Sequence, residues 1–289
     1  SNVTDTYDGS EIYLEDFGTV NVTVNGASKF DELASYSSSG ADYTSQAINI
    51  VANADLTLES LDVADEGSDL VTISGAGNVT INDYDGTYDA LSTTVSDKID
   101  ASALTGNLYV EVSEPINSII GGSGDDTIIA DDVTTFGDAT QGGLVLTGGS
   151  GTDTVGFYQA DYTGTIAAGS ATARAGISGF EALALVDALG TATYDLSAIS
   201  GIASFTAMDG IAAGNTATVS NIGADATITL AGDLVANNGA LSGTLKTDGT
   251  NDRTTLVLNS DFADNNDTTA DATAVSSTVD LSEVEKLTV

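Results

Sequence analysis

The sequence contains no cysteine, no histidine and no tryptophan, and it has one proline in 289 residues. Without cysteine the chain cannot form a disulfide, a thiolate nucleophile or a cysteine-ligated zinc site. Without histidine it lacks the side chain that most often serves as a general base near neutral pH. Positive charge is also scarce, because 6 basic residues oppose 43 acidic ones and give a formal net charge of -37. Such a surface repels nucleic acids and anionic membranes but attracts cations.

Two further absences limit the function. No run approaches the roughly 20 apolar residues of a membrane-spanning helix, so we expect no membrane span. Paired carboxylates can hydrolyse glycosides, but basic residues are scattered singly and no tryptophan is present to stack on a sugar. We therefore expect no enzyme, and we assign no catalytic residue.

The residues that are abundant favour an all-β fold. Glycine occurs 32 times, and Thr, Val, Ile, Asp and Asn are frequent, which is typical of short strands joined by tight turns. Lys29 to Tyr36, with Ser28 as a possible N-cap, is predicted to be a short helix. The expected strands are Val20 to Val24, Ile48 to Val51, Leu56 to Leu61, Leu70 to Ile73, Val79 to Ile81, Leu108 to Val112, Leu144 to Leu146, Thr154 to Tyr158, Ala182 to Val186, Ser204 to Ala207, Ala217 to Ser220, Thr227 to Leu230, Thr255 to Leu258 and Lys286 to Val289.

Repeated phrases favour a parallel β-solenoid over a sandwich or a barrel. An apolar residue followed by Asp, Ala or Leu, and Ser recurs at Ile99, Tyr194 and Val279, and an apolar-Glu-x-Leu phrase recurs at Phe180 and Val284. In a solenoid such phrases occupy equivalent places in successive coils. We predict an N-terminal β region at 1–55, with the short helix and a sandwich-like arrangement as an alternative, and a repetitive solenoid at 56–289. The chain ends inside an expected strand, so we also expect the natural polypeptide to continue.

Two glycine loops are the sharpest local signals. Both match G-G-x-G-x-D-x-U-x, a turn that binds Ca²⁺ through carbonyl and aspartate oxygens before an aliphatic residue enters the core. Ile128 and Val155 are the predicted aliphatic anchors. A degenerate copy at Ser74 to Ile81 has Val79 where the aspartate belongs. The predicted metal-binding residues are Gly121, Gly122, Gly124, Asp126, Gly148, Gly149, Gly151 and Asp153.

The loops are not in tandem, so each needs further oxygen donors from an adjacent coil. Asp125, Asp131, Asp132 and Asp138 are the candidate donors. The alternative interpretation is that both loops are glycine corners that bind no metal tightly, since turn glycines are common without one.

At these loops and at the repeated Asp-Ala/Leu-Ser phrases, the sequence resembles S-layer proteins of Gram-negative bacteria and their secreted RTX relatives. The resemblance is best over Leu56 to Val155. It implies a secreted, extracellular protein that folds with Ca²⁺ and assembles with its own copies on the cell surface. Three readings stay open: a lattice-forming coat segment, a calcium-dependent adhesin or biofilm-matrix repeat that binds a cell-surface polysaccharide, and an acidic surface adapted to salt.

Overall fold

The structure, a computed structural model, describes residues 11–15, 18–36, 47–64, 69–85, 98–112, 116–130, 133, 144–212, 214–231, 239–247, 252–259, 278–281 and 286–288. It is nearly all parallel β-structure, in which stacked coils form a β-solenoid of about 7 turns, and only 7% is helical. The predicted fold class, an all-β parallel solenoid, is therefore confirmed. Among the described residues, no helix is both long and apolar enough to cross a membrane.

The chain divides into two compact units. Unit 1 comprises Ser1–Val155 and Ser170–Phe180, and unit 2 comprises Gly156–Gly169 and Glu181–Val289. The predicted division into 1–55 and 56–289 stays a prediction.

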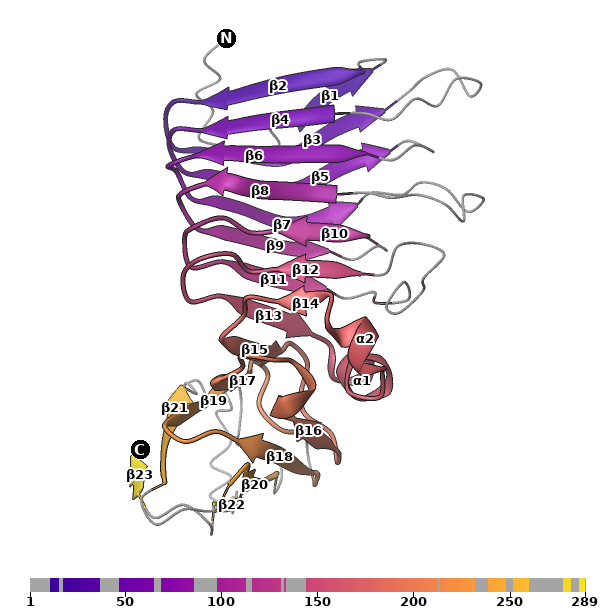
Figure 1. Ribbon diagram of the computed structural model, residues 1–289. Helices are drawn as coiled ribbons and strands as arrows, with labels where there is room; N and C mark the ends of the chain where they lie inside the picture. Colours follow the sequence, from indigo (N-terminus) through magenta and orange to yellow (C-terminus); the bar gives the residue numbers. More distant parts are fainter. Residues whose placement is uncertain are drawn as a thin grey trace, which may run out of the picture. The chain divides into compact units, whose positions relative to one another are not determined.

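Unit 1 is built from two parallel sheets, and each coil contributes one strand to each sheet (Figure 1). The first sheet runs in the order β1 (Glu11–Glu15), β3 (Ser28–Tyr36), β5 (Leu56–Ala64), β7 (Val79–Asp85), β9 (Leu108–Val112), β11 (Thr127–Ala130) and β13 (Thr154–Phe157), the last of which begins in unit 1. The second sheet runs in the order β2 (Thr19–Val24), β4 (Ala47–Ala52), β6 (Leu70–Gly75), β8 (Lys98–Leu104), β10 (Ser118–Ile120), β12 (Val145–Thr147) and β14 (Ile177–Ser178). The short helix α2 (Ala171–Arg174) also belongs to this unit.

The core of unit 1 consists of columns of stacked aliphatic side chains. In the second sheet, Ile48, Val71 and Ile99 stand in register on successive strands and are fully buried. The predicted anchors Ile128 and Val155 are buried as well. Because side chains alternate between the two faces of a strand, keeping register from coil to coil places every second residue in this core.

The helix predicted for Lys29 to Tyr36 is wrong, because these residues lie in strand β3. This strand pairs in parallel with β1 and with β5, and Leu33 and Ala34 on it are buried. Its helix-forming residues are overridden by pairing on both sides. The sandwich-like alternative is also not what the structure has, since β2 pairs with β4 and β4 with β6 in parallel, as in the later coils.

Unit 2 repeats the coil with shorter sheets. One sheet holds β15 (Ala182–Leu185), β17 (Ser204–Ala207), β19 (Ala226–Ala231), β21 (Arg253–Asn259) and β23 (Lys286–Thr288). The other holds β16 (Thr193–Asp195), β18 (Thr216–Ile222), β20 (Ala240–Leu245) and β22 (Thr278–Asp280). Three short helical turns complete the unit: α1 (Gln159–Asp161), the π-helical η1 (Tyr162–Ile166) and the 3-10 turn η2 (Leu196–Ala198).

The repeated phrases do mark equivalent local structures. Asp100 accepts a hydrogen bond from the Ser102 N–H at 3.0 Å, and Asp195 accepts one from the Ser197 N–H at 2.9 Å. The phrase at Ile99 begins on β8, in the second sheet of unit 1, and the phrase at Tyr194 begins on β16, in the four-stranded sheet of unit 2. The phrase at Phe180 leads into β15, which confirms the strand predicted at Ala182 to Val186.

Candidate functional site

All eight predicted metal-binding residues lie in two turns, β10 to β11 and β12 to β13, on the side of unit 1 where the second sheet leads into the first (Figure 1). The two turns belong to adjacent coils. The Asp126 N–H donates to Asp153 Oδ1 at 2.8 Å across 27 residues, which is the length of one coil here. The spacing that separates the loops in sequence therefore stacks one directly on the other.

The glycines of these turns allow the coils to approach closely. A Cβ at Gly122 would overlap the Leu104 carbonyl oxygen of the preceding coil, and a Cβ at Gly149 would overlap that of Gly122. Gly149 and Gly151 also have φ values of 117° and 139°, which side chains rarely tolerate. A separate column runs through Gly77 in the degenerate copy, Gly106, Gly124 and Gly151, where the Cβ of each would overlap the backbone of the coil before it. The glycine pattern is thus required by coil stacking.

Asp126 holds the backbone of its own coil and of the preceding one. Its side chain is 1% exposed, and its Oδ1 accepts the Leu108 N–H at 2.7 Å while Oδ2 accepts the Gly122 N–H at 2.6 Å. Burial raises the pKa of the Asp126 carboxyl, while the two backbone hydrogen bonds lower it and the neighbouring Asp125 charge raises it, with a net upward direction. Asp153, equally buried, makes the corresponding bond to the Asp126 N–H.

Asp126 and Asp153 accept N–H groups from the coil before their own. A second ladder of side-chain oxygens, one residue before Asp126 and before the equivalent positions of other coils, accepts N–H groups from the coil that follows. Asp55 Oδ1 accepts the Asn78 N–H at 2.9 Å, and Asn78 Oδ1 accepts the Asn107 N–H at 2.9 Å. Asn107 Oδ1 accepts the Asp125 N–H at 3.0 Å, and Asp125 Oδ1 accepts the Thr152 N–H at 2.8 Å. Each bond links a coil to the next one toward the C-terminus. Sequence reasoning missed this ladder as a unit, although an Asp or Asn that recurs just before a buried strand was the signal.

The carboxylate of Asp126 does not fit a Ca²⁺ site in this arrangement. Both oxygens of Asp126 face backbone N–H donors, whose dipoles present positive charge where a cation would have to lie. No group of three or more acidic side chains able to hold a metal occurs among the residues that the structure describes. The candidate donors Asp131, Asp132 and Asp138 lie outside those residues. Calcium binding by the loops stays a prediction.

The ladder itself can be tested at Asn107. We expect Asn107→Ala to lower the free energy of unfolding by about 1 kcal/mol, because the Asp125 N–H loses its partner. Asn107→Asp keeps an acceptor oxygen at the same place and should recover most of the loss. Urea unfolding followed by circular dichroism measures both variants. Equal stability of the alanine variant and the native protein would show that the ladder contributes nothing.

Comparison with known proteins identifies no relative. No family model, no curated protein and no solved structure matches the chain.

Proposed function

We propose that this chain is a non-catalytic structural segment of a secreted bacterial cell-surface protein, which assembles side by side with its own copies into a surface layer. The proposal rests on the hydrogen bonds that the carboxylates in these turns accept. Asp126 and Asp125, the polar side chains of the sharpest motif, bind backbone N–H groups of stacked coils. The loop that was the best candidate for a metal site therefore has a structural role, which favours a scaffold function.

Secretion and surface location rest on the resemblance to S-layer and RTX proteins. The absence of cysteine does not oppose an extracellular location, because a long β ladder can stabilise a chain without disulfides. Cations favour the assembly of such chains, since they screen the repulsion between two chains of like charge.

The excess of negative charge gives a prediction for the stability of the chain. We expect the melting temperature to rise as NaCl is increased from about 10 mM to 500 mM, because the Debye length falls from about 30 Å to a few ångströms and self-repulsion is screened. At constant ionic strength, Ca²⁺ and Mg²⁺ should then act alike. A gain produced by Ca²⁺ alone, and abolished by Asp126→Ala together with Asp153→Ala, would contradict this and establish the calcium site.

The function is tested by following assembly of the purified protein. Sedimentation velocity over a concentration series in 150 mM salt should show reversible association, and electron micrographs of concentrated samples should show ordered side-by-side arrays. A protein that stays monomeric at every concentration would overturn self-assembly. Binding of polysaccharide by monomers would indicate an adhesin, and release of sugar ends from polysaccharide would indicate an enzyme.

A further inference from the structure

The outer face of the second sheet of unit 1, formed by β2, β4, β6, β8, β10, β12 and β14, is nearly free of charge; we call it the neutral face. Its outward positions carry mainly Thr, Asn, Ser, Ala and Val. On these seven strands the charged residues are Lys98 and Asp100, both on β8 and of opposite sign. In a chain with 43 acidic residues, a seven-stranded face with no net charge is a marked departure from the average surface.

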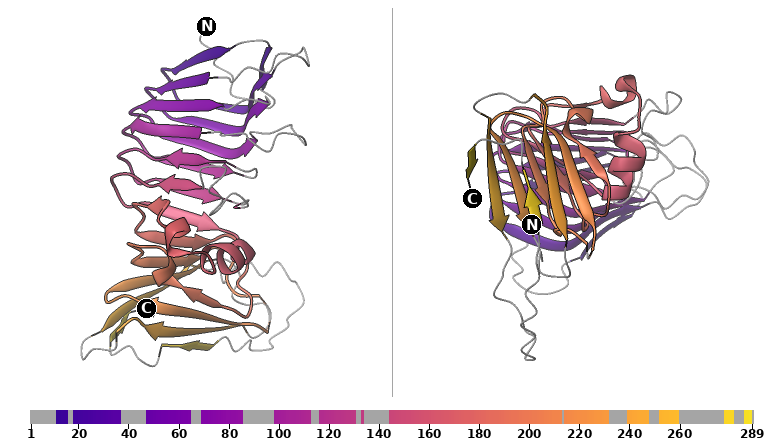
Figure 2. Two further views of the ribbon diagram at one scale, coloured as in Figure 1. Left: turned by 45° about the vertical axis from the view of Figure 1, so that its right-hand side comes forward. Right: turned by 90° about the horizontal axis from the view of Figure 1, so that it is seen from below.

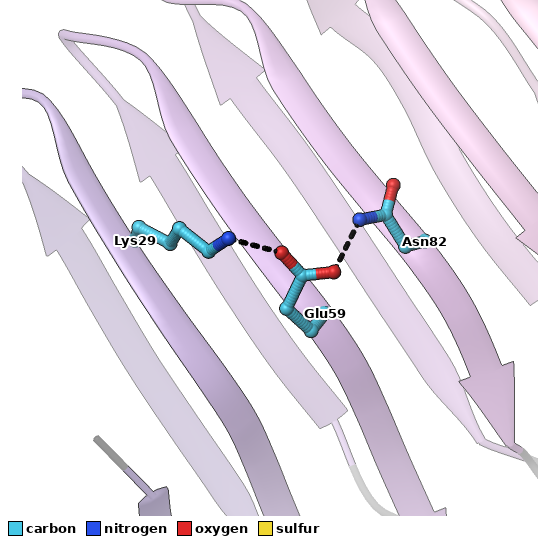
Figure 3. A network of polar contacts seen from close by, with 3 residues as sticks. All are labelled: Lys29, Glu59 and Asn82. Carbon is cyan, nitrogen blue, oxygen red and sulfur yellow. Dashed lines mark hydrogen bonds and ion pairs between the residues drawn. The ribbon is translucent and has the colours of Figure 1, made fainter. Parts of the chain in front are cut away.

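The outer face of the first sheet of the same unit is acidic, and we call it the acidic face. Glu11, Glu32, Glu59 and Glu111 lie on its strands β1, β3, β5 and β9. Its cation is Lys29, which is held by Glu59 at 2.5 Å, while Asn82 donates to the other oxygen of the same carboxylate (Figure 3). The two sheets form opposite layers of the coil (Figure 2). Unit 1 therefore has one acidic and one neutral face.

Polar side chains on the neutral face satisfy one another along a row of successive strands. The Asn49 Nδ2 donates to Asn21 Oδ1 at 3.0 Å, and the Thr72 Oγ1 donates to Asn49 Oδ1 at 2.6 Å. Apolar side chains stand beside this row, with Val51 at 37% and Leu70 at 39% exposure. Covering such a face removes apolar surface from water and leaves few polar groups without a partner, which keeps the desolvation cost low.

We propose that the neutral face is where two copies of this chain dock against each other. This inference rests on the proposed function, and it names the surface that the assembly uses. Two chains of charge -37 repel each other, and contact through two acidic faces would bring like charges together. Contact through two neutral faces avoids that repulsion, and a twofold arrangement of the same face on both copies is the commonest way in which identical chains pair.

The size of the face suits a weak and repeated contact. Seven strands about 4.8 Å apart, with a rise of about 3.3 Å per residue, cover about 500 Å² on each copy. The total of about 1,000 Å² lies at the lower limit of specific interfaces. The sheets of unit 2 have five and four strands and offer less area. A single pair should therefore associate weakly, and stable assembly needs many pairs.

The proposal is tested by placing one negative charge on each face. Thr72→Glu adds it to the neutral face, Thr80→Glu adds it to β7 on the acidic face, and Thr229→Glu adds it to β19 in unit 2. All three variants carry the same net charge. We expect Thr72→Glu to weaken association in sedimentation velocity at least tenfold, and we expect the other two to leave it within about twofold. Circular dichroism confirms that each variant is folded.

Chemical crosslinking gives an independent readout that does not depend on perturbing the face. Because the chain has no cysteine, a single introduced thiol reports one position without ambiguity. With a short bismaleimide, Val51→Cys on the neutral face should give a covalent dimer, whereas Thr80→Cys should stay monomeric.

The outcomes separate this inference from the proposed function. If the native protein assembles and Thr72→Glu leaves its association unchanged, the neutral face is not the docking surface, although self-assembly stands. The same conclusion follows if Thr80→Cys crosslinks and Val51→Cys does not. If the native protein never associates at any concentration or salt, self-assembly itself is overturned.

Discussion

Replacement of Asp126 by alanine should lower the free energy of unfolding by about 2 to 6 kcal/mol. The substitution leaves the N–H groups of Leu108 and Gly122 buried without an acceptor, and each unsatisfied group costs about 1 to 3 kcal/mol. A matched control is Asp83→Ala, which removes the same charge from an exposed position on β7 and should change stability by no more than about 0.5 kcal/mol. Urea unfolding monitored by circular dichroism measures the difference.

The same variant distinguishes a structural aspartate from a metal ligand. If Asp126 holds the backbone, the loss should be equal in EGTA and in millimolar Ca²⁺, because no ion takes part. A loss that appears only in the presence of Ca²⁺ would contradict this account. Asp126→Asn sharpens the comparison, since its amide nitrogen would face one of the two N–H donors and should still cost about 1 to 3 kcal/mol.

Gly149→Ala is the second variant with a large expected effect. The added Cβ would overlap the Gly122 carbonyl oxygen of the coil below, and the backbone has a φ of 117° that alanine disfavours. Because the obstacle is backbone in a stacked coil, the chain cannot relieve it by a rotamer change. We expect a loss of at least about 3 kcal/mol, or failure of unit 1 to fold.

Gly26→Ala is the matched control for this experiment. Gly26 lies in the equivalent turn between β2 and β3, and a Cβ there would meet no atom within 4 Å. This variant should be within about 1 kcal/mol of the native protein, in either direction. Thermal melts and soluble yield compare the pair. If both glycine variants are equally stable, close coil stacking is not what the glycines serve.

The parallel solenoid could be predicted from two features of the sequence. Alternating aliphatic residues such as Ile48 and Ile50 indicate a half-buried strand, and the repeated phrases place similar strands at equivalent points of successive coils. Strand β3 escaped prediction because Lys29 to Tyr36 has helical propensity, and only its pairing with β1 and β5 decides its conformation.

The candidate site could be located from the sequence, but its role could not be derived from it. The motif at Gly121 to Asp126 fixes the position of a tight turn and of a carboxylate. It does not reveal which groups that carboxylate meets, because the partners of Asp126 include Leu108, which is 18 residues away on another coil. The ladder through Asn78 and Asn107 depends in the same way on which residues the stacking brings together.

Amide hydrogen exchange tests the central claim most directly, namely that the turn aspartates hold the stacked backbone. In metal-free buffer with EGTA, we expect the N–H groups of Leu108, Gly122 and Asp126 to be protected to the same degree as those in the buried strands. The protection of the Leu108 and Gly122 N–H groups should be lost in Asp126→Ala. Rapid exchange at these three amides in EGTA, with protection appearing only when Ca²⁺ is added, would contradict the account.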